Sequence, residues 1–542
     1  MTAADRASRA PRYTFADTLD EQESQLSDNP LVRRMAASRT ALAGDPHRPL
    51  YHFVSPESKL NDPNGLCFWQ GRWHLFYQGF PPEEPRPHWG HAVSDDLIHW
   101  RDLPYAINPD PEESCYSGST LVEDDRVIAI YYGTQVGNMV AVSSDPLLLN
   151  WEKVTGRAVI PIPDDDGSPR QFTVYDPCIW QRDGVYYSLS GGAVTDGPGG
   201  RRIAADFLFR SRDLETWEYL HPLTEGDRFT LVGDDGACPY FWPIGDRHML
   251  LFFSHMSGGQ YLLGDYDADR DKLVVTSHGL FNFGPAVPSG VHAPSAMPDG
   301  QGGIIVLFNM NAGFPSPGWD QIMTLPRRIT LAGDDDVRVE PAGDIESLRH
   351  EHRHVGPTEL PANEEVVLAG IAGNTLELAL EIDPGESPMV ELNVLRSPGR
   401  EEYTRIAFYK ERGFRVQYPS VRPGAVHHNG QVAIGGYKSP WPASRHESLL
   451  TLDTSYASTL PDALSRAPET APLRLDPDEP LRLRVFVDRS VVEVFANGKQ
   501  CVAVRVYPGR SDSTGVSLRA QGSPAQLRSL DAWQMRSIYP QP

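Results

Sequence analysis

The sequence lacks the features of a membrane-spanning, secreted or disulfide-stabilised protein. No stretch approaches the ~18 consecutive apolar residues that a membrane-spanning helix requires. The N-terminal segment MTAADRASRAPRYTFADTLDEQES has no apolar core and is not a secretory signal, so we expect a cytoplasmic protein. Cysteine is scarce, and the few that occur form no CxxC pair and no zinc pattern with histidine. We therefore expect reduced and mostly buried thiols at Cys67, Cys115, Cys178, Cys238 and Cys501.

Positive charge is also in short supply. The chain has 49 Lys and Arg against 72 Asp and Glu, which gives a net charge of −23 over 542 residues. Such a chain would repel phosphates, which argues against nucleic acid as the main partner. The content of 40% hydrophobic and 22% charged residues is that of a soluble protein with a sizeable core. At ~100–200 residues per domain, the length predicts two to four domains.

One strand-like pattern recurs five times in the first 310 residues, in place of any long apolar period of 3.6 residues. Each copy has aromatic or branched residues after a Gly or Asp turn. With Tyr77, Tyr132, Tyr187, Phe253 and Phe308 as anchors, the successive spacings are 55, 55, 66 and 55 residues. A repeat of about this length with several strands per unit is typical of a β-propeller blade. We therefore predict an all-β protein that begins with a five-bladed β-propeller.

A short motif precedes every anchor, by 11 residues in the third unit and by 15 residues in the others. The motifs are NDPNG at Asp62, YSGS at Ser117, YDP at Asp176, ACP at Cys238 and HAPS at Ala293. In a propeller the first strand of each blade lines the central channel. We therefore expect the five motifs to converge on one funnel.

The repeat stops near residue 357. Segments such as VVLAGIAGNTLELALEI and LRLRVFVDRSVVEVFANG alternate apolar with polar residues, which predicts the antiparallel strands of a β-sandwich. We divide the chain into an N-terminal extension (1–48), the propeller (49–340), a linker with a short helix at IESLR (341–356) and a C-terminal β-sandwich (357–542).

Two of the motifs place a carboxylate before proline. Asp-Pro-Asn-Gly at Asp62 is also a good type I turn, but Asp176 occupies the equivalent position in another unit, so the two would face each other across the channel. Glycoside hydrolysis uses paired carboxylates: one attacks or stabilises the oxocarbenium-like centre, and a partner protonates the departing oxygen. Aromatic side chains near these motifs would either stack on the sugar or pack the propeller core; they are Trp69, Trp73, Tyr77, Trp89 and Tyr116.

The motifs together resemble glycoside hydrolase family 32, which contains invertases, levanases and inulinases. The opening segment HFVSPESKLNDPNGLCFWQGRWHLFYQGFP resembles the family's first blade almost throughout, and HWGHAVSDDLIHW, YSGST, LFRSRDLETWEYL and LTLPRRITL also match. FVDRSVVEVFANG resembles the signature of the family's β-sandwich module. The similarity extends over about residues 49–535.

This resemblance implies a five-bladed propeller followed by a β-sandwich, a retaining mechanism, and no metal or other cofactor. It implies that Asp62 is the nucleophile that forms a fructosyl–enzyme ester, and that Asp176 stabilises the transition state by hydrogen-bonding ring hydroxyls. The positions that the family uses to hold the fructosyl unit are occupied by Asn61, Gln78, Trp89 and Ser117.

The chain departs from the family at two positions. The family's Arg-Asp-Pro is Tyr175-Asp176-Pro177 here, so a phenol replaces a cationic donor to the bound sugar. The family's general acid is a Glu directly before Cys-Pro, and this chain has Ala237 there. General acid catalysis is worth about 10²–10⁴-fold, and alanine cannot donate a proton.

Three explanations for the missing acid stay open at this point. Asp235 or Asp234 serves from a shifted register, His255 or His292 takes the role, or the site has no acid at all. We take Asp235 as the acid/base candidate.

The sequence thus predicts a retaining glycosidase that cleaves small β-fructofuranosides, such as sucrose or short fructo-oligosaccharides. One alternative is fructosyl transfer to a second sugar. Another is a non-catalytic carbohydrate-binding or sensing protein, which Ala237 favours. A third is activity on another furanoside, for example an arabinofuranoside-like sugar. We expect a small carbohydrate as the ligand, no nucleic-acid or membrane partner, and leave open an oligomer formed through the β-sandwich.

Overall fold

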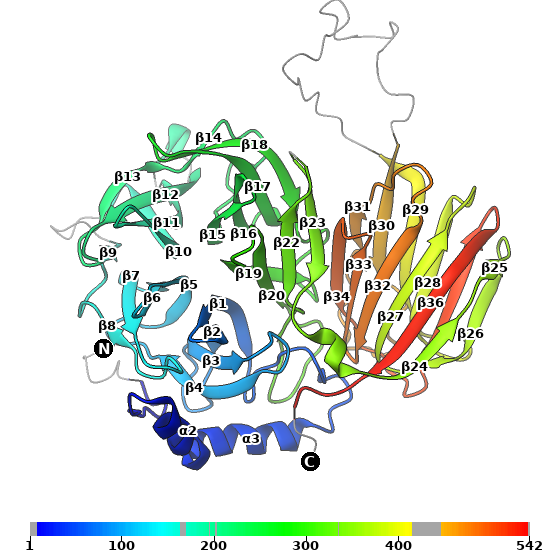
Figure 1. Cartoon of the computed structure of the whole chain (residues 1–542), viewed down its shortest axis with the longest axis horizontal. Coiled ribbons are helices and arrows are strands. Elements are labelled where there is room, and N and C mark those ends of the chain that lie inside the picture. The colour runs from blue at the N-terminus through cyan, green and yellow to red at the C-terminus, as the bar shows by residue number, and fades with distance from the viewer. Residues whose placement is uncertain are drawn as a thin grey trace, which may run out of the picture.

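The computed structural model of the chain describes residues 8–162, 170–194, 196–200, 203–333, 335–414 and 446–539. A ring of sheets and a two-sheet sandwich lie side by side, and two helices run beneath the ring (Figure 1). The prediction of an all-β propeller followed by a β-sandwich is confirmed.

Within the described residues the ring consists of five sheets, antiparallel except for the short edge strand β14, which pairs with β18 in parallel. Their strands follow chain order from the channel outward except for short additions. The first two sheets contain β1 (Leu60–Trp69), β2 (Arg72–Gly79), β3 (His88–Ser94) and β4 (Arg101–Ile107), then β5 (Cys115–Val122), β6 (Val127–Gly133), β7 (Gly137–Ser143), β8 (Glu152–Lys153) and β9 (Ile160–Pro161). The third contains β10 (Phe172–Arg182), β11 (Val185–Val194), β12 (Ile203–Ser211) and β13 (Glu218–Pro222), with the 3-10 turn Pro198–Gly200 before β12.

The last two sheets complete the ring. They contain β14 (Thr224–Glu225), β15 (Ala237–Ile244), β16 (Arg247–Ser254), β17 (Gly258–Asp267) and β18 (Lys272–Leu280), then β19 (Val291–Pro298), β20 (Ile304–Met310), β21 (Ile322–Met323), β22 (Arg327–Leu331) and β23 (Val337–Pro341). Every sequence motif lies on the first long strand of its sheet, at β1, β5, β10, β15 and β19, and the five anchors lie on the second strands or at their ends. The predicted repeat therefore corresponds to the sheets one for one.

The sandwich pairs a seven-stranded sheet, with the path β24-β36-β27-β32-β33-β34 and β25 beside β36, with a six-stranded sheet, β26-β35-β28-β29-β30-β31. Its strands are β24 (Arg349–Val355), β25 (Thr358–Leu360), β26 (Glu365–Ala372), β27 (Thr375–Asp383), β28 (Met389–Arg396), β29 (Thr404–Phe414), β30 (His446–Asp453), β31 (Glu469–Pro472), β32 (Leu481–Asp488), β33 (Val491–Ala496), β34 (Gln500–Arg505), β35 (Gly515–Gln521) and β36 (Ala525–Met535). Alternate residues of both sheets, such as Leu378, Val485, Leu392 and Leu518, fill the core between them.

The expected linker over residues 341–356 is structured. The IESLR segment forms the 3-10 helix Ile345–Leu348, as the sequence suggested, but residues 349–355 form β24, which pairs with β36. The sandwich therefore begins about eight residues earlier than predicted. The sequence RHEHRHV hides this strand because most of its side chains face solvent, so the strand carries no apolar alternation.

The two bodies share an apolar interface that contains a buried ionic network. Phe486 and Phe495 on the seven-stranded sheet pack with Leu307 and Met323 of the fifth propeller sheet. Beside them, fully buried His52 lies 2.9 Å from Asp488 and 3.1 Å from Glu493 through its two ring nitrogens. These contacts fix the sandwich against the outside of the ring, away from the channel (Figure 1).

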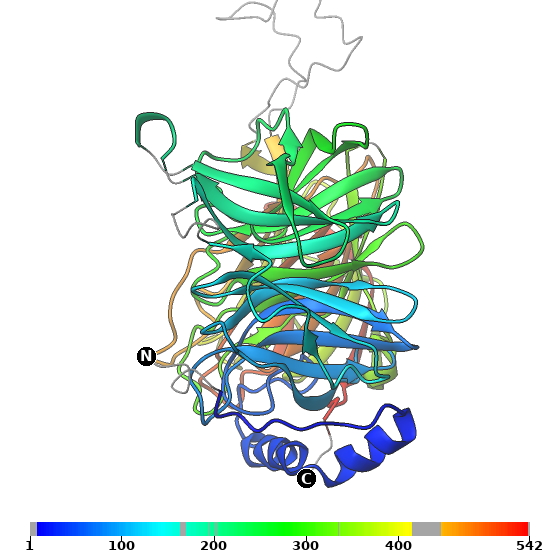
Figure 2. The same cartoon turned by 90° about the vertical axis from the view of Figure 1, so that its left-hand side faces the viewer.

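The N-terminal extension lies along one edge of the molecule (Figure 2). It contains α2 (Leu19–Asp28) and α3 (Pro30–Leu42), and neither helix is long and apolar enough to cross a membrane; the same holds for every helix of the described residues. Arg39 of α3 makes two hydrogen bonds to the Asp102 carboxylate of β4, and Gln22 of α2 donates to Asp145. The extension is thus attached to the first two propeller sheets.

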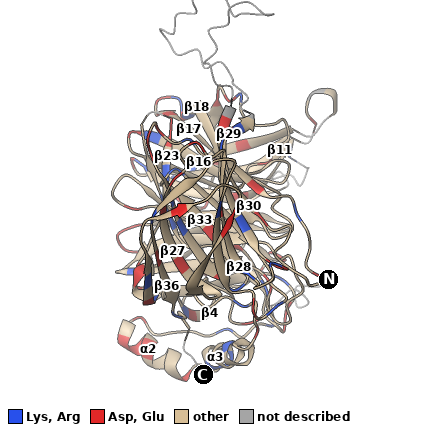
Figure 3. Cartoon of the chain, turned by 90° about the vertical axis from the view of Figure 1, so that its right-hand side faces the viewer, with Lys and Arg blue, Asp and Glu red and all other residues tan. Residues whose placement is uncertain are grey.

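The acidic excess does not leave the sandwich with a one-sign face. In Figure 3, Lys and Arg interleave with Asp and Glu over its strands. Glu381 on β27, for example, pairs with Arg482 on β32 and Arg528 on β36. The five cysteines are all buried and none forms a disulfide.

Candidate active site

Each of the five inner strands has a local irregularity at its motif. The pairing with the second strand shifts register between Leu60 and Pro63, Cys115 and Gly118, Tyr175 and Pro177, Ala237 and Tyr240, and Val291 and Pro294. Asp176 and Cys238 lie inside these bulges with positive φ angles of 40° and 50°. Because a bulge re-aims the side chain at the extra residue, the motifs direct polar groups into the channel.

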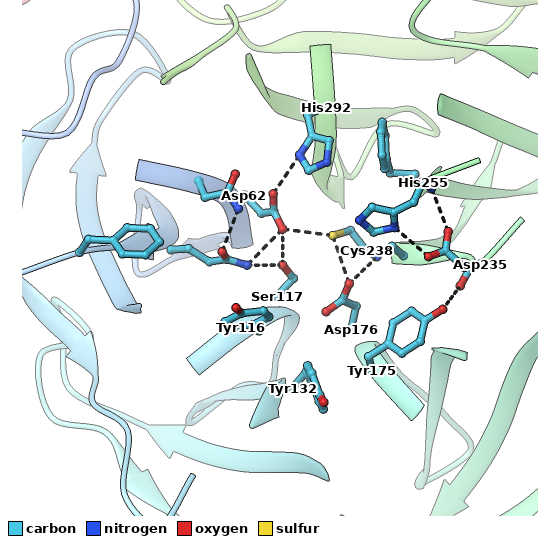
Figure 4. Close-up of a pocket in the computed structure, with 15 residues that line it drawn as sticks. Asp62, Tyr116, Ser117, Tyr132, Tyr175, Asp176, Asp235, Cys238, His255 and His292 are labelled. Carbon is cyan, nitrogen blue, oxygen red and sulfur yellow. Dashed lines mark hydrogen bonds and ion pairs between the residues drawn. The ribbon is translucent and has the colours of Figure 1, made fainter. Parts of the chain in front are cut away.

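Residues on and beside the inner strands line a cavity of about 360 Å³ (Figure 4). This volume is near the lower limit for small-molecule sites. The lining residues are Asn61, Asp62, Gln78, Phe80, Tyr116, Ser117, Tyr132, Tyr175, Asp176, Asp235, Ala237, Cys238, Phe253, His255 and His292. The structure thus brings together motifs from all five sheets, as the repeat predicted.

The carboxylate of Asp62 is buried and surrounded by donors from four other strands. Gln78 Nε2 lies 3.1 Å and Ser117 Oγ lies 2.7 Å from Asp62 Oδ2, and Cys238 Sγ lies 3.7 Å from the same oxygen. His292 Nδ1 lies 3.1 Å from Oδ1. Burial by itself raises the pKa of Asp62, but the hydrogen bonds from His292, Ser117 and Cys238 outweigh it and hold the pKa below its ordinary value. Asp62 is therefore an anion at neutral pH.

The carboxyl of Asp176 lies across the cavity, and its pKa is shifted in the opposite direction from that of Asp62. It accepts a hydrogen bond from the Cys238 backbone N–H at 3.3 Å, and Cys238 Sγ lies 3.6 Å from the same oxygen. Burial, together with the negative charge of Asp62, raises the pKa of Asp176 to about 7. One thiol thus separates two carboxyl groups whose environments move their pKa values apart.

Four of the five predicted sugar-binding residues line the cavity, and Trp89 does not. Asn61, Gln78 and Ser117 line the cavity and are joined by hydrogen bonds: Asn61 Nδ2 donates to Gln78 Oε1 at 3.1 Å, and Gln78 Nε2 donates to Ser117 Oγ at 2.8 Å. Tyr175 also lines it, and its hydroxyl donates to the Asp235 carbonyl at 2.9 Å.

Trp89 does not reach the cavity, contrary to the prediction. It is fully buried on β3, which β2 separates from the inner strand β1, and its indole N–H donates to the Tyr116 carbonyl at 2.9 Å. Trp89 supports Tyr116 from behind instead of contacting a ligand. Of the five aromatic residues named from sequence as stacking candidates, Tyr116 lines the cavity.

Sequence reasoning missed the contributions of Tyr132, Phe80 and the Cys238 thiol. Tyr132 was an anchor of the repeat, and its ring lies 6.1 Å from that of Tyr116 and 6.5 Å from that of Tyr175. Its position at the end of the second strand, on the channel side, was the available signal. Cys238 was visible in the ACP motif, but nothing in the sequence indicated that its thiol separates Asp62 from Asp176.

The acid candidates Asp235 and His255 are in direct contact. Asp235 Oδ2 lies 2.7 Å from His255 Nδ1, and the His255 backbone N–H donates to Asp235 Oδ1 at 3.0 Å. Asp234 is not among the lining residues, and its carboxylate accepts hydrogen bonds from the Ser254 and Ser257 hydroxyls. Among the described residues, no group of three or more His, Cys, Asp or Glu is arranged to hold a metal ion.

Comparison with known proteins places both bodies in one family. The protein-family model described as "Glycosyl hydrolases family 32 N-terminal domain" matches residues 52–341. The family model described as "Glycosyl hydrolases family 32 C terminal" matches residues 344–534. Levanase of Bacillus subtilis is 26% identical, over 93% of this chain and 72% of its own, and sucrose-6-phosphate hydrolase of Escherichia coli is 26% identical over 93% and 99%. The fold is similar to fructan 1-exohydrolase IIa from Cichorium intybus, with a TM-score of 0.75 and 22% identity over 91% and 98% of the two chains.

Proposed function

The chain belongs to glycosyl hydrolase family 32, and from that premise we propose that it hydrolyses β-fructofuranosides with retention of configuration. The observation that carries the proposal is the pair Asp62 and Asp176, which face each other across a small cavity with pKa values moved in opposite directions. Retaining glycosidases need an ionised carboxylate that attacks the anomeric carbon. The hydrogen bonds to Asp62 keep it in that form.

In the first step, an Asp62 oxygen attacks C2 of the fructosyl unit while the bond from C2 to the leaving oxygen breaks. The product is a fructosyl ester of Asp62, which water then hydrolyses at C2 to regenerate the carboxylate. Asp176 supports the oxocarbenium-like transition state through the ring hydroxyls. Asn61, Gln78 and Ser117 form a connected set of polar groups that suits the hydroxyls of one furanosyl ring.

The cavity volume of about 360 Å³ favours a terminal fructosyl unit over an internal one. Relatives named levanase and sucrose-6-phosphate hydrolase indicate the range of substrates to test. We take sucrose and short fructo-oligosaccharides as the substrates of this chain. Tyr175 replaces the family's cationic donor, so a charge beside the sugar is lost. The phenol hydroxyl donates to the Asp235 carbonyl.

One observation favours a second candidate function, a carbohydrate-binding protein without turnover. Ala237 stands where the family resemblance requires a carboxylic acid, and it lines the cavity directly. A binding protein has no use for an ionised carboxylate held by four donors, so the geometry of Asp62 supports the enzyme.

The deciding experiment measures fructose release from sucrose, inulin and levan oligosaccharides by the purified chain and by Asp62→Asn. Release that disappears in the variant establishes a nucleophile-dependent enzyme, and the ratio of free fructose to longer oligosaccharides separates hydrolysis from fructosyl transfer. Calorimetric binding of the same sugars without any product would establish the binding protein. The cytoplasmic location and an oligomer formed through the β-sandwich stay predictions; cell fractionation and sedimentation test them.

A further inference from the structure

The position of the missing acid is flanked by two titratable side chains on the same sheet. Ala237 on β15 is paired with Phe253 on β16 at the channel end of this ladder. Asp235 and His255 lie two residues beyond these partners, one on each chain segment. The chain turns at both places, with a φ of 59° at Gly236, and the side chains of Asp235 and His255 line the same cavity as Ala237.

Asp235 and His255 form a fixed pair. Besides the two hydrogen bonds that join them, the Tyr175 hydroxyl donates to the Asp235 backbone carbonyl at 2.9 Å. The His255 ring also packs edge-on against Phe253, with ring centroids 5.7 Å apart. Figure 4 shows the imidazole between Asp235 on one side and the space above Cys238 and Asp176 on the other. The Asp235 carboxylate therefore binds His255 Nδ1, and Nε2 faces the space where a ligand would bind.

The protonation states of the two groups suit a cationic donor. The hydrogen bond that His255 donates to Asp235 raises the pKa of His255, and the negative charges of Asp235, Asp176 and Asp62 add to this effect against burial. Burial acts to raise the pKa of Asp235, but the hydrogen bonds from His255 outweigh it and the pKa is lowered. Asp235 is therefore the acceptor of this pair, and His255 carries the proton that the pair can deliver.

We propose that His255 is the general acid/base of this site, oriented by Asp235, in place of the carboxylic acid that Ala237 lacks. This inference rests on the proposed fructosidase function. As the bond from C2 to the leaving oxygen breaks, its electron pair takes the proton from His255 Nε2, and imidazolium becomes imidazole. In the second step neutral Nε2 accepts a proton from the water that attacks C2, which restores imidazolium as the Asp62 ester breaks.

The location of His255 at the mouth supports this role. Its side chain is 65% exposed, whereas Asp62 and Asp176 are buried at the base of the cavity. A fructosyl ring seated on the two carboxyl groups would direct its leaving group towards the mouth. Asp176 is the rival donor because its pKa is also raised, but its oxygen already accepts from the Cys238 backbone N–H at the base.

The first test varies the leaving group. In His255→Gln, kcat/KM for sucrose is expected to fall about 10²–10⁴-fold, the usual worth of general acid catalysis. With 4-nitrophenyl β-D-fructofuranoside it should stay within a few-fold, because nitrophenolate departs without a proton. Asp62→Asn should lose activity on both substrates. His221→Gln changes a half-buried histidine outside the cavity and should retain activity on both substrates.

Each other outcome has a definite meaning. Unchanged sucrose hydrolysis in His255→Gln, or this substrate pattern in Asp176→Asn instead, overturns the assignment while the fructosidase function stands. A wild-type chain that cleaves the nitrophenyl substrate but not sucrose has no acid, which also overturns it. A wild-type chain that cleaves neither removes the proposed function and this inference with it.

The second test concerns the positioning role of Asp235. The titratable groups that face His255 are Asp235, Asp62, Asp176, His292 and Cys238. Asp235→Asn removes the largest of the influences that raise its pKa, so the basic limb of kcat/KM for sucrose should move to lower pH. Asp235→Glu should restore part of the shift. Asp234→Asn, in the same turn but bonded to Ser254 and Ser257, should leave the limb in place; an equal shift there would contradict the pairing.

Discussion

His292 Nδ1 lies 3.1 Å from Asp62 Oδ1, although the two residues belong to the last and the first sheet of the ring. The contact forms where the ring closes, since β1 packs directly against β19. Because the Asp62 carboxylate is ionised, Nδ1 must carry the proton. The proposed nucleophile is thus held in its charged form by a residue of the sheet that closes the ring.

Removal of the His292 donor should raise the pKa of Asp62. The acidic limb of kcat/KM for sucrose reports the ionisation of Asp62, so His292→Phe is expected to move that limb to higher pH, since the hydrogen bond from His292 opposes the effect of burial. His292→Asn offers an amide donor near the position of Nδ1 and should shift the limb less. Superimposable acidic limbs for wild type and His292→Phe would contradict this role.

Asp62→Asn should lower kcat by about 10⁴-fold or more, because the loss of a nucleophile removes the covalent route altogether. Initial-rate assays of fructose release measure the effect. The matched control is Asp183→Asn, which alters an exposed hairpin residue with φ of 51°, a conformation that asparagine tolerates. The proposed nucleophile would be wrong if the two variants retained similar rates.

Asp176→Asn should stabilise the fold at alkaline pH while it abolishes activity. The folded-state pKa of about 7 lies above the unfolded value, so between about pH 4 and pH 7 the folded state retains a proton that the unfolded state has lost. This group therefore makes stability fall as pH rises through that window. At pH 8 the variant should gain about 2–4 kcal/mol in the free energy of unfolding, and near pH 4 the gain should vanish.

Urea denaturation at the two pH values measures this difference. Asp62→Asn serves as the contrast, since the lowered pKa of Asp62 means that its carboxylate stabilises the fold above its unfolded pKa, and loses that contribution as pH falls. Asp62→Asn should therefore bring no gain at pH 8. A gain for Asp176→Asn that is the same at pH 4 and pH 8 would show that charge is not its cause.

Trp89→Phe should reduce stability by about 1–3 kcal/mol and leave KM for sucrose near its original value. The substitution removes the hydrogen bond to the Tyr116 carbonyl and leaves a space in a fully buried position. Tyr116→Ala should show the opposite pattern, because Tyr116 is 40% exposed and lines the cavity. Thermal denaturation and steady-state kinetics distinguish the two; a raised KM in Trp89→Phe would place that residue in the sugar site after all.

Local sequence patterns predict much of this architecture. The anchors Tyr77 and Phe308 recur because each blade needs the same buried second strand, so strand periodicity and spacing alone predict the repeat. The same spacing put Asp62 and Asp176 on equivalent first strands. The strand at 349–355 was missed because its solvent-facing side chains give no apolar alternation.

The contacts between side chains of different strands were beyond sequence reasoning. Trp89 lies in a motif shared with the family, yet it packs behind Tyr116. It is on the third strand of its sheet, and the channel wall is formed by the first. Asp235 and His255 were separate candidates in the sequence and are one hydrogen-bonded pair in the structure.

The sequence by itself therefore determined the ring, the sandwich and the presence of Asp62 and Asp176 in one cavity. These depend on hydrophobic periodicity and repeat length, which are local and additive along the chain. Tertiary structure alone decided which carboxyl is charged and which group can deliver a proton. Those properties depend on burial and on hydrogen bonds from Cys238, His255 and His292, which adjoin the carboxylates only after the sheets have closed into a ring.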